Sequence, residues 1–243
     1  MRLDKLLAHA GYGTRKEVKE LIKKRFVTVD KKVITKNNQH VQPDQQEIKV
    51  KGEVVHYQKY IYIMLHKPPN YLSATKDQRD KTVLDLIPDT YLHYHLFPVG
   101  RLDKDTEGLL LLTNDGQFNH ALTSPKRNVF KTYFAKVDGK VTETHIKQFE
   151  KGIVLDDGYK TKPAYLEIEK SNTISEITLS ISEGKFHQVK RMFRAIGMEV
   201  IYLKRTHIGE LALDETLALG EMRLLNDREL EYLFMKTGQE RGR

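Results

Sequence analysis

The segment Pro98-Val99-Gly100-Arg101-Leu102-Asp103-Lys104-Asp105-Thr106-Glu107-Gly108 runs directly into four leucines, Leu109 to Leu112. It places three carboxylates two residues apart, immediately before a run that is typical of a buried strand. Calcium loops use acidic ligands at a similar spacing, but Asn114 stands where such a loop has its bidentate Glu. The segment is therefore either a charged turn that leads into a strand or a loop whose carboxylates take part in chemistry.

A second informative segment is Ser182-Glu183-Gly184-Lys185-Phe186-His187-Gln188-Val189-Lys190-Arg191-Met192-Phe193. Read as a helix, it places Val189, Met192 and Phe193 on one apolar face. The basic side chains that fall together on the other face are His187, Lys190, Arg191 and Arg194. Such a face suits either solvent or an anionic partner.

A third segment, Lys131-Thr132-Tyr133-Phe134, lies in a predicted strand over residues 130–137. A Tyr in a strand is usually a half-buried packing residue, because aromatic rings fill the pleated surface well. Histidines elsewhere in the chain, such as His66 and His207, show no spacing that would assemble a metal site. We therefore expect no bound metal.

Taken together and in chain order, these three segments resemble the catalytic motifs of the pseudouridine synthases, specifically of the RsuA/RluB-type branch. The matching stretches are Gly100-Arg101-Leu102-Asp103 with Asp105 to Leu110, then Lys131-Thr132-Tyr133, and then His187 to Phe193. The resemblance implies that Asp103 is the nucleophile and that Lys190 is its ion-pair partner. It also implies that Tyr133 stacks on the target base and can act as a general base.

The same resemblance implies an RNA substrate whose target base is flipped out of the stack, with Arg101 helping to occupy the gap that the base leaves. His187, Gln188, Arg191 and Arg194 are expected to contact RNA, Arg191 through a phosphate. A carboxylate can attack carbon covalently and so divide a difficult isomerisation into two easier steps. Whether the attack falls on the sugar or on the pyrimidine stays open. No cofactor is expected, because the isomerisation is redox-neutral.

The distribution of charge separates a basic N-terminal part from a nearly neutral remainder. The 243 residues contain 41 Lys and Arg against 33 Asp and Glu, a formal net charge of +8. Residues 1–59 hold 14 of the basic residues and 7 of the acidic ones, which leaves 27 and 26 for residues 60–243. A polyanion such as nucleic acid is the natural partner, since cations on phosphates release counterions and gain affinity without reading sequence. Ordinary solvated surface is the alternative.

The basic part has the pattern of a small RNA-binding module. Leucines at helical spacing predict a first helix that Gly11 and Gly13 end, and Thr14-Arg15-Lys16-Glu17 is a capping box that opens a second one. The polar face of the second helix carries a stripe of cations, Arg15, Lys16, Lys19 and Lys23. Residues 2–52 resemble the alpha-L RNA-binding module first seen in a small-subunit ribosomal protein, which implies that this stripe contacts RNA.

The remainder of the chain predicts an α+β fold. Strands are expected at residues 61–65, 109–113, 130–137, 164–169, 174–182 and 200–204, and helices at 82–87, 116–122, 142–150, 186–196 and 227–235. Because they do not alternate strictly, we expect a mixed, largely antiparallel sheet flanked by helices rather than a doubly wound nucleotide-binding fold. No Gly-rich phosphate loop occurs in the sequence. We expect two domains, the alpha-L type RNA-binding module over residues 1–58 and a pseudouridine synthase catalytic domain over residues 59–238.

The composition excludes several other classes of protein. Cys is absent, which excludes disulfides, thiolate nucleophiles and Cys-based zinc sites. No run approaches the roughly 18 apolar residues that span a bilayer. The polar start of the chain is unlike a secretory signal. We therefore expect a cytoplasmic monomer with no membrane partner.

These observations predict the site-specific isomerisation of one uridine to pseudouridine in 16S ribosomal RNA. The third motif, with its His187-Gln188 pair, resembles the small-subunit enzymes more than the large-subunit ones, and a small-subunit assembly intermediate is the expected partner. Thr106-Glu107-Gly108-Leu109 resembles the large-subunit relatives instead, so an enzyme of 23S ribosomal RNA is one alternative. A non-catalytic RNA-binding factor of ribosome assembly, which uses both basic faces for binding, is the other.

Overall fold

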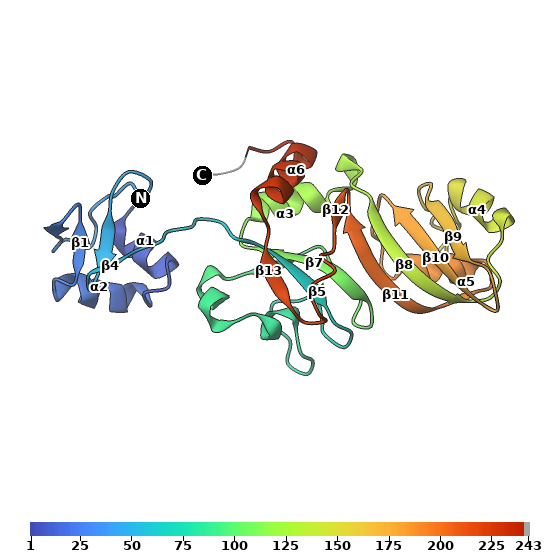
Figure 1. Cartoon of the computed structure of the whole chain (residues 1–243), viewed down its shortest axis with the longest axis horizontal. Coiled ribbons are helices and arrows are strands. Elements are labelled where there is room, and N and C mark those ends of the chain that lie inside the picture. The colour runs from blue at the N-terminus through green and yellow to red at the C-terminus, as the bar shows by residue number, and fades with distance from the viewer. Residues whose placement is uncertain (241–243) are drawn as a thin grey trace. The chain divides into compact units, whose positions relative to one another are not determined.

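The computed structural model of the chain describes residues 1–240, which form two compact units (Figure 1). Residues 1–61 and 87–96 make up the first unit, and residues 62–86 and 97–240 make up the second. The inserted segment contains a 3₁₀ helix, η2 (Asp89–Tyr94), whose Tyr94 ring meets the His9 ring edge-on at 5.6 Å. The chain therefore passes from the second unit to the first and back again.

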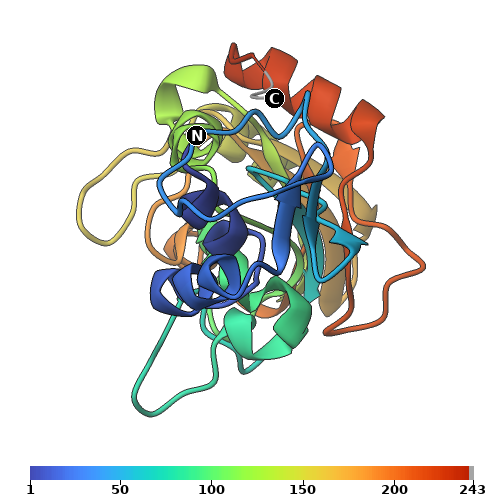
Figure 2. The same cartoon turned by 90° about the vertical axis from the view of Figure 1, so that its left-hand side faces the viewer.

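Two short helices and a small sheet form the first unit. The helices are α1 (Leu3–His9) and α2 (Arg15–Lys23), and the strands are β1 (Val27–Val29), β2 (Lys32–Val33), β3 (Ile48–Val50) and β4 (Glu53–Val54). The strands pair in the order β2-β1-β3-β4, and each pair is antiparallel. The two helices lie side by side in dark blue in Figure 2, and buried residues such as Leu3, Ile22 and Val27 form one core.

The capping box that the sequence predicts at the start of α2 is present. Thr14 Oγ accepts a hydrogen bond from Glu17 N at 3.3 Å, and the Glu17 carboxylate accepts one from Thr14 N at 2.7 Å. Each hydrogen bond gives a partner to one backbone N–H group at the start of the helix. The N–H of Glu17 is one of the first-turn groups that have no partner within the helix. The helix that displays the cationic stripe therefore has a defined first residue.

The second unit is built on a sheet of nine strands within residues 62–240, with the main order β13-β5-β7-β11-β8-β10-β9. The strands are β5 (Tyr62–Lys67), β6 (Phe97–Val99), β7 (Glu107–Thr113), β8 (Lys131–Asp138), β9 (Tyr165–Lys170), β10 (Ile174–Ile181), β11 (Glu199–Ile208), β12 (Leu211–Ala212) and β13 (Met222–Leu224). In this described part of the chain β7 and β11 pair in parallel, and the other pairs are antiparallel. The predicted α+β fold with a mixed, largely antiparallel sheet is confirmed.

Helices pack on this sheet in two pairs. They are α3 (Gly116–Thr123), α4 (Glu143–Glu150), α5 (Gln188–Ala195) and α6 (Asp227–Thr237), accompanied by the 3₁₀ turns η1 (Val83–Leu86) and η3 (Pro125–Arg127). α3 and α6 meet β5 through the rings of Tyr62, Phe118 and Phe234, whose centroids lie 5.0 to 5.6 Å apart. α4 and α5 meet through Phe149 and Phe193 at 5.0 Å. None of the helices formed by residues 1–240 combines the length and the apolar character that crossing a membrane requires.

Strand β8 sorts its side chains onto two faces, because successive residues of a strand point to opposite sides. Tyr133, Ala135 and Val137 are buried on one face, whereas Lys136 is exposed on the other. Lys131 stands two residues before Tyr133, so both side chains belong to the same face. This alternation places both of them at the pocket described below.

Three local expectations differ from the structure. The helix expected at 82–87 is a short 3₁₀ turn, because the Asp85 carboxylate accepts the backbone N–H of Thr82 at 2.6 Å and closes the segment early. The helix expected from residue 186 begins at Gln188, because the His187 backbone is left-handed with φ of +48°. Strands β6, β12 and β13 were not predicted, because two or three residues carry too little period-two pattern.

Candidate active site

Asp103 lies in the acidic loop, which we define as residues 100–108; it connects β6 to β7 and includes the first two residues of β7. Ser73 Oγ donates to the Leu102 carbonyl at 2.9 Å and accepts from Leu102 N at 3.0 Å. Within the loop, Thr106 N donates to the Asp103 carbonyl at 3.1 Å. The backbone is therefore a fixed turn, and it presents an Asp103 side chain that is 25 % exposed.

A buried ammonium group supports this loop. Lys67, the last residue of β5, is inaccessible to solvent. Its Nζ donates to the carbonyls of Pro68 at 3.0 Å, Lys104 at 3.2 Å and Thr106 at 2.8 Å. Burial lowers the pKa of Lys67 to about 8, although the nearby acidic side chains oppose that shift. Sequence reasoning missed Lys67, because a Lys at the end of an apolar strand usually reaches solvent.

Gly108 ends the acidic loop where β7 comes close to β11. The two strands pair in parallel, with Gly108 opposite Arg205. A Cβ on Gly108 would lie 2.2 Å from the Arg205 carbonyl oxygen, and the backbone φ is +109°. Only Gly combines this conformation with so close an approach. The contact holds Arg205 beside the loop that carries Asp103.

Lys190 of α5 meets two carboxylates of the acidic loop. Its Nζ lies 3.6 Å from Asp103 Oδ2 and donates to Asp105 Oδ1 at 2.5 Å. Burial acts to raise the pKa of Asp105, but the Lys190 hydrogen bond and charge outweigh it, so this pKa lies below its ordinary value. His187 Nε2 lies 3.7 Å from Asp103 Oδ1. Two basic side chains thus face Asp103, and Lys190 is shared between two acids.

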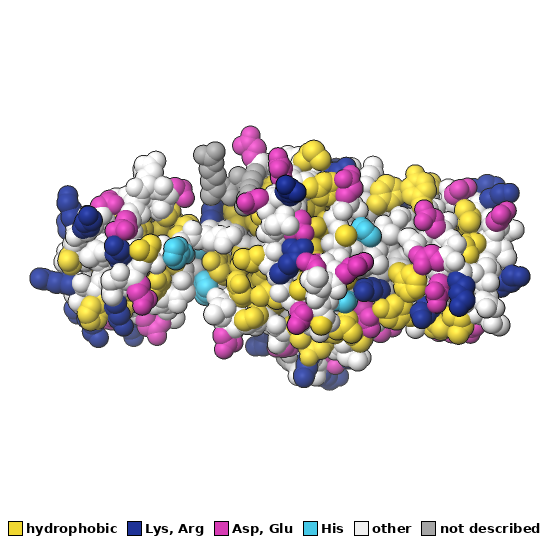
Figure 3. Space-filling model, in the orientation of Figure 1, with side chains coloured by type: hydrophobic (Ala, Val, Ile, Leu, Met, Phe, Trp, Pro, Cys, Tyr) yellow, Lys and Arg dark blue, Asp and Glu magenta, His cyan; other side chains and the backbone are white. Residues whose placement is uncertain are grey.

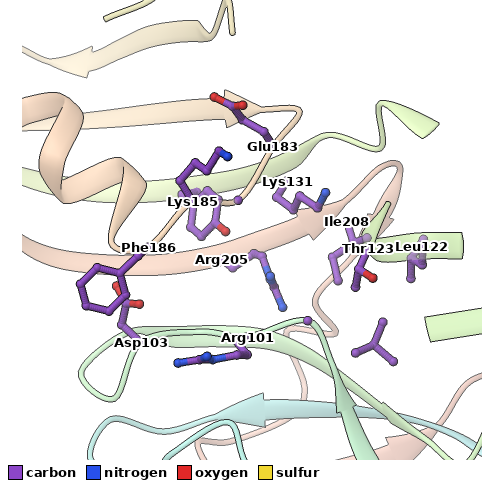
Figure 4. A pocket seen from close by; sticks show the side chains of 14 residues that line it. Arg101, Asp103, Leu122, Thr123, Lys131, Glu183, Lys185, Phe186, Arg205 and Ile208 are labelled. Atoms are coloured by element: carbon purple, nitrogen blue, oxygen red, sulfur yellow. The ribbon is translucent and has the colours of Figure 1, made fainter. Parts of the chain in front are cut away.

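Asp103 and Tyr133 line one pocket with a volume of about 370 Å³ (Figure 4). Its walls come from the acidic loop, the end of α3, strands β8 and β11, and the segment that precedes α5. Tyr133 is 8 % exposed, and Arg101 also lines the pocket from an exposed position. The volume lies in the range of small-ligand sites, roughly 300 to 1,000 Å³.

Arg191 does not share the surroundings of Lys190, contrary to the single basic face expected for this helix. Its guanidinium forms ion pairs with Asp156 and, at 2.7 Å, with Asp157. Neighbouring residues of a helix point about 100° apart, so Lys190 reaches the acidic loop while Arg191 reaches the loop before β9. Arg194 follows the buried residues Met192 and Phe193 in the helix, and its side chain is exposed.

Gln188 is 4 % exposed and has partners within the protein. Its Nε2 donates to Glu183 Oε1 at 2.8 Å, and its Oε1 accepts the backbone N–H of Lys185 at 2.8 Å. Glu183 is itself buried, and it also accepts hydrogen bonds from Tyr159 Oη at 2.7 Å and Lys162 N at 3.0 Å. Glu183 therefore organises the turn that leads into α5, a role that its position in the sequence did not reveal.

Three further cations line the pocket that were not among the predicted site residues, namely Lys131, Lys185 and Arg205. Lys185 is exposed, and its Nζ lies 4.6 Å from the centroid of the Tyr159 ring. Arg205 comes from β11 and Lys131 from β8. Lys131 could have been inferred, because it stands two residues from Tyr133 in a strand. Arg205 had no local signal, since only the pairing of β8 with β11 brings it opposite Tyr133.

The cationic stripe of the first unit is a separate feature. Its members are Arg15, Lys16, Lys19 and Lys23. All are exposed, and none forms a salt bridge within residues 1–240. Figure 3 shows several dark-blue Lys and Arg side chains over this unit, with magenta acidic side chains among them. An exposed, unpaired stripe is available to a polyanion.

The pocket combines groups with complementary chemistry. Asp103 offers a carboxylate beside a cation, and Tyr133 offers an aromatic wall for a planar ring. Among residues 1–240 there is no group of three or more His, Asp or Glu side chains placed to hold a metal ion. The arrangement is suited to covalent attack on a small, flat, polar ligand.

Both units of the chain are similar in sequence to known protein families. Residues 61–195 match the family model described as RNA pseudouridylate synthase, and residues 1–47 match the model of the S4 domain. The chain is 50 % identical over 236 residues to an uncharacterised RNA pseudouridine synthase of Bacillus subtilis (strain 168), and the match covers 96 % of this chain and 98 % of that one.

Two relatives with ribosomal names differ in the subunit that they name. Ribosomal large subunit pseudouridine synthase B of Bacillus subtilis is 42 % identical, with coverage of 96 % and 95 %. Ribosomal small subunit pseudouridine synthase A of Vibrio cholerae is 41 % identical, with coverage of 95 % and 98 %. A crystal structure of a pseudouridylate synthase matches with a TM-score of 0.68 at 36 % identity, over 96 % of this chain and 99 % of that one.

Proposed function

Because this chain belongs to the RNA pseudouridylate synthase family, it is an RNA-modifying isomerase, and we propose that it converts one uridine of 16S ribosomal RNA with Asp103 as nucleophile. The observation that carries the proposal is the setting of Asp103. Its carboxylate lines a pocket with Tyr133 and lies 3.6 Å from Lys190 Nζ. A carboxylate held between a cation and an aromatic wall is suited to attack the nucleotide that enters this pocket.

The reaction exchanges one bond for another within a single nucleotide. The bond between N1 of uracil and C1′ of ribose breaks, and C5 becomes bonded to C1′. The hydrogen of C5 leaves as a proton, and N1 gains one. Asp103 divides the exchange into two steps by bonding covalently to carbon first. Lys190 forms an ion pair with the Asp103 carboxylate, with 3.6 Å between Nζ and Oδ2, and so holds it beside a cation.

A uridine stacked in an RNA stem must leave the stack before Asp103 can reach it. We assign Tyr133 the role of the wall on which the flipped base stacks, with its hydroxyl available as a general base. Arg101, exposed at the pocket, enters the gap in the stack. His187 and Arg194 contact the RNA nearby. The intramolecular partners of Gln188 and Arg191 favour positioning roles, although both remain candidates for RNA contacts.

The first unit contributes affinity for RNA. The cationic stripe of α2 is exposed and suited to the phosphate backbone. We divide the functions at residue 58, with RNA binding in residues 1–58 and catalysis in residues 59–238. The expected partner is a small-subunit assembly intermediate in the cytoplasm, and the protein is expected to act as a monomer.

The choice of 16S over 23S ribosomal RNA rests on the third motif. His187-Gln188-Val189-Lys190-Arg191-Met192-Phe193 resembles the small-subunit enzymes. The relatives named for the two subunits are nearly equal in identity to this chain, at 41 % and 42 %, so they favour neither subunit. Direct assay of both RNAs is therefore the decisive experiment.

The test is tritium release from C5-labelled uridine in full-length 16S and 23S transcripts, each offered alone and with bound ribosomal proteins. We expect release from 16S RNA by the wild-type chain. Asp103→Asn should abolish release and leave RNA affinity unchanged, because the amide keeps the shape of the side chain but is a poor nucleophile.

Each other result identifies an alternative. Release from 23S RNA alone would retain the reaction and overturn the choice of subunit. Tight, salt-sensitive binding without release from any RNA would favour the non-catalytic assembly factor. Full activity of Asp103→Asn would remove Asp103 from the role of nucleophile.

A further inference from the structure

Arg205 is a buried cation whose hydrogen-bonding capacity is only partly used. Its side chain is 3 % exposed and lines the pocket from β11. Its Nε donates to the Leu109 carbonyl at 2.7 Å, whereas Nη2 has no hydrogen-bond partner within residues 1–240. No carboxylate in this described part of the chain forms an ion pair with it. Burying a guanidinium without an anion costs free energy that a bound anionic group would offset.

Lys131 is a second cation in the same pocket. It forms no salt bridge with any described residue, and the two carboxylates that line the pocket, Asp103 and Glu183, have other partners. Burial, followed by the positive charges of Arg205 and Lys162, lowers the pKa of Lys131 to about 8. Two cations that repel each other therefore share a confined space without a counterion from the protein.

Both cations lie beside Tyr133, on which the target base stacks if the proposed function is correct. Arg205 stands opposite Tyr133 in the pairing of β8 with β11, and Lys131 stands two residues before it on the same face. In the view of Figure 4 the Arg205 guanidinium lies below the Lys131 side chain and above that of Arg101, with Asp103 to its left. A nucleotide whose reacting carbon meets Asp103 can therefore extend its ring toward both cations.

A nucleotide has oxygens on its phosphates and on its base, and burial favours the base. A flipped nucleotide enters a pocket with its base, and its phosphates stay with the RNA backbone outside. Arg205, at 3 % exposure, lies at the inaccessible end of that path. The carbonyl oxygens of uracil are the acceptors that reach this depth.

We propose that Arg205 and Lys131 form a cationic site for the carbonyl oxygens of the target uracil and stabilise the negative charge that the ring acquires during the reaction. This inference rests on the proposed function and adds two residues to its site. Cations fixed in advance in a dry pocket stabilise developing charge more than they would in water. The site therefore acts on the transition state more than on RNA binding.

Either mode of attack puts negative charge on the ring. If the Asp103 carboxylate bonds to C1′, the electron pair of the bond between C1′ and N1 leaves with uracil and is shared by N1 and O2. If the carboxylate bonds to C6, the electron pair of the C5=C6 double bond moves to C5 and O4. Neither route needs a further reactant, and both end at a carbonyl oxygen that a cation can meet.

The test compares Lys131→Met and Arg205→Met with wild type in the full chain, on the RNA that wild type modifies. Lys136→Met is the matched control, because Lys136 lies in the same strand on the opposite face. We expect each pocket variant to lower the single-turnover rate at saturating RNA by about 100-fold. The Kd for RNA should change by less than about threefold, because these contacts strengthen in the transition state. The control should change neither quantity.

A second arm replaces the target uridine by 5-fluorouridine. Fluorine withdraws electrons and itself stabilises negative charge on the ring. A variant that lacks one of the cations should therefore lose less of the wild-type rate on 5-fluorouridine than on uridine. We expect the rate deficit of Lys131→Met, measured as loss of 5-fluorouridine from the RNA, to shrink to about tenfold or less. An undiminished deficit would overturn the role in charge stabilisation.

Other outcomes also overturn the proposal. A raised Kd with an unchanged rate at saturating RNA would assign the cations to a phosphate, and an uncharged methylphosphonate beside the target would then mimic the variants. Unchanged rate and Kd in both variants would remove the site altogether. If circular dichroism shows that Arg205→Met is unfolded, the rate and the Kd of Lys131→Met alone test the proposal. Inactive wild type would refute the proposed function, whereas active wild type with unaffected Lys131→Met refutes this inference alone.

Discussion

The cations of α2 and the cations around the pocket lie in opposite physical settings. The stripe of α2 is exposed and forms no salt bridge within residues 1–240. Around the pocket, Lys190 and Arg191 are paired with carboxylates, and Lys67 and Arg205 are buried. Exposed charges are screened by salt and act collectively on a polyanion. A confined charge acts strongly on the few groups that lie next to it.

This contrast separates two kinds of information in a basic protein. A local surplus of exposed cations indicates affinity for RNA, and that affinity depends little on the exact position of each cation. A confined cation has a few partners at set distances, so its effect depends on its position rather than on the number of cations nearby. The predictions below test whether the two regions differ in this way.

The largest expected effect comes from Lys190, the confined cation beside Asp103, which is the proposed nucleophile. Lys190→Met should lower turnover roughly 10²- to 10³-fold, because Asp103 loses the cation that forms an ion pair with it at 3.6 Å. Asp105→Asn is the matched control, since it removes the other partner of Lys190 and leaves Asp103 intact. It should cost less than about tenfold. Steady-state kcat for both variants measures the difference, and equal losses would mean that Lys190 acts mainly through Asp105.

A smaller effect should follow loss of the confined cation under the acidic loop. Lys67→Met leaves three carbonyls without their donor and should lower the free energy of unfolding by about 2 kcal/mol at pH 7. The folded Lys67 has a pKa of about 8 against an ordinary 10.5, so between these values the unfolded chain binds more protons. Wild-type stability relative to the variant should therefore rise with pH across that interval.

Denaturant unfolding of wild type and Lys67→Met at several values between pH 7 and pH 10.5 measures this gap. Lys104→Met is a suitable control, because it removes an exposed cation of the same loop whose Nζ pairs with Asp80 on the surface. A gap that narrows as the pH rises would contradict the buried-charge interpretation of Lys67.

The exposed stripe should respond to number rather than to position. A variant in which Arg15, Lys16, Lys19 and Lys23 are all changed to Ser should reduce the slope of log K against log salt by about 3. Affinity at low salt should fall, and kcat at saturating RNA should stay unchanged. The matched control changes four exposed lysines of the second unit to Ser, namely Lys140, Lys147, Lys151 and Lys170. Equal slopes for both variants would mean that α2 is not the RNA-binding surface.

The smallest expected effect concerns the helix that presents the stripe. Thr14→Ala removes the side-chain cap of α2 and should cost about 1 kcal/mol of stability in the first unit. Thr14→Ser keeps the hydroxyl and should restore most of that loss. RNA affinity should change by less than threefold in either variant, since the cations themselves remain. Thermal unfolding and a binding titration check both statements, and a larger loss of affinity would show that helix order limits binding.

Consecutive residues were enough to identify the elements that carry Asp103, Tyr133 and Lys190. Glycines and a short acidic run before four leucines mark a loop that enters a buried strand, and period-two burial in β8 follows from its sequence. The helices at 116–122, 142–150 and 227–235 are confirmed within two residues. These features are local, so their pattern is complete within one segment.

Other parts of the site depend on contacts between distant segments. Arg205 lies just beyond the strand expected at 200–204, and its burial follows from the pairing of β11 with β7 and β8. Lys67 reads as a polar strand end, but the acidic loop folds over it. Arg191 was expected on the face of Lys190, and the acids of the loop before β9 give it separate partners.

The sequence alone determined the fold class, the basic N-terminal module and the family resemblance. It also indicated the candidate nucleophile and its neighbours. Each of these is encoded by spacing or composition within one segment. Only the tertiary structure decided which charged side chains are confined and which groups they contact. A parallel pairing of β7 with β11 brings residues about one hundred positions apart within a few ångströms, and no local pattern encodes that approach. Burial and distance, which set the strength of each charge, exist only after the sheet has formed.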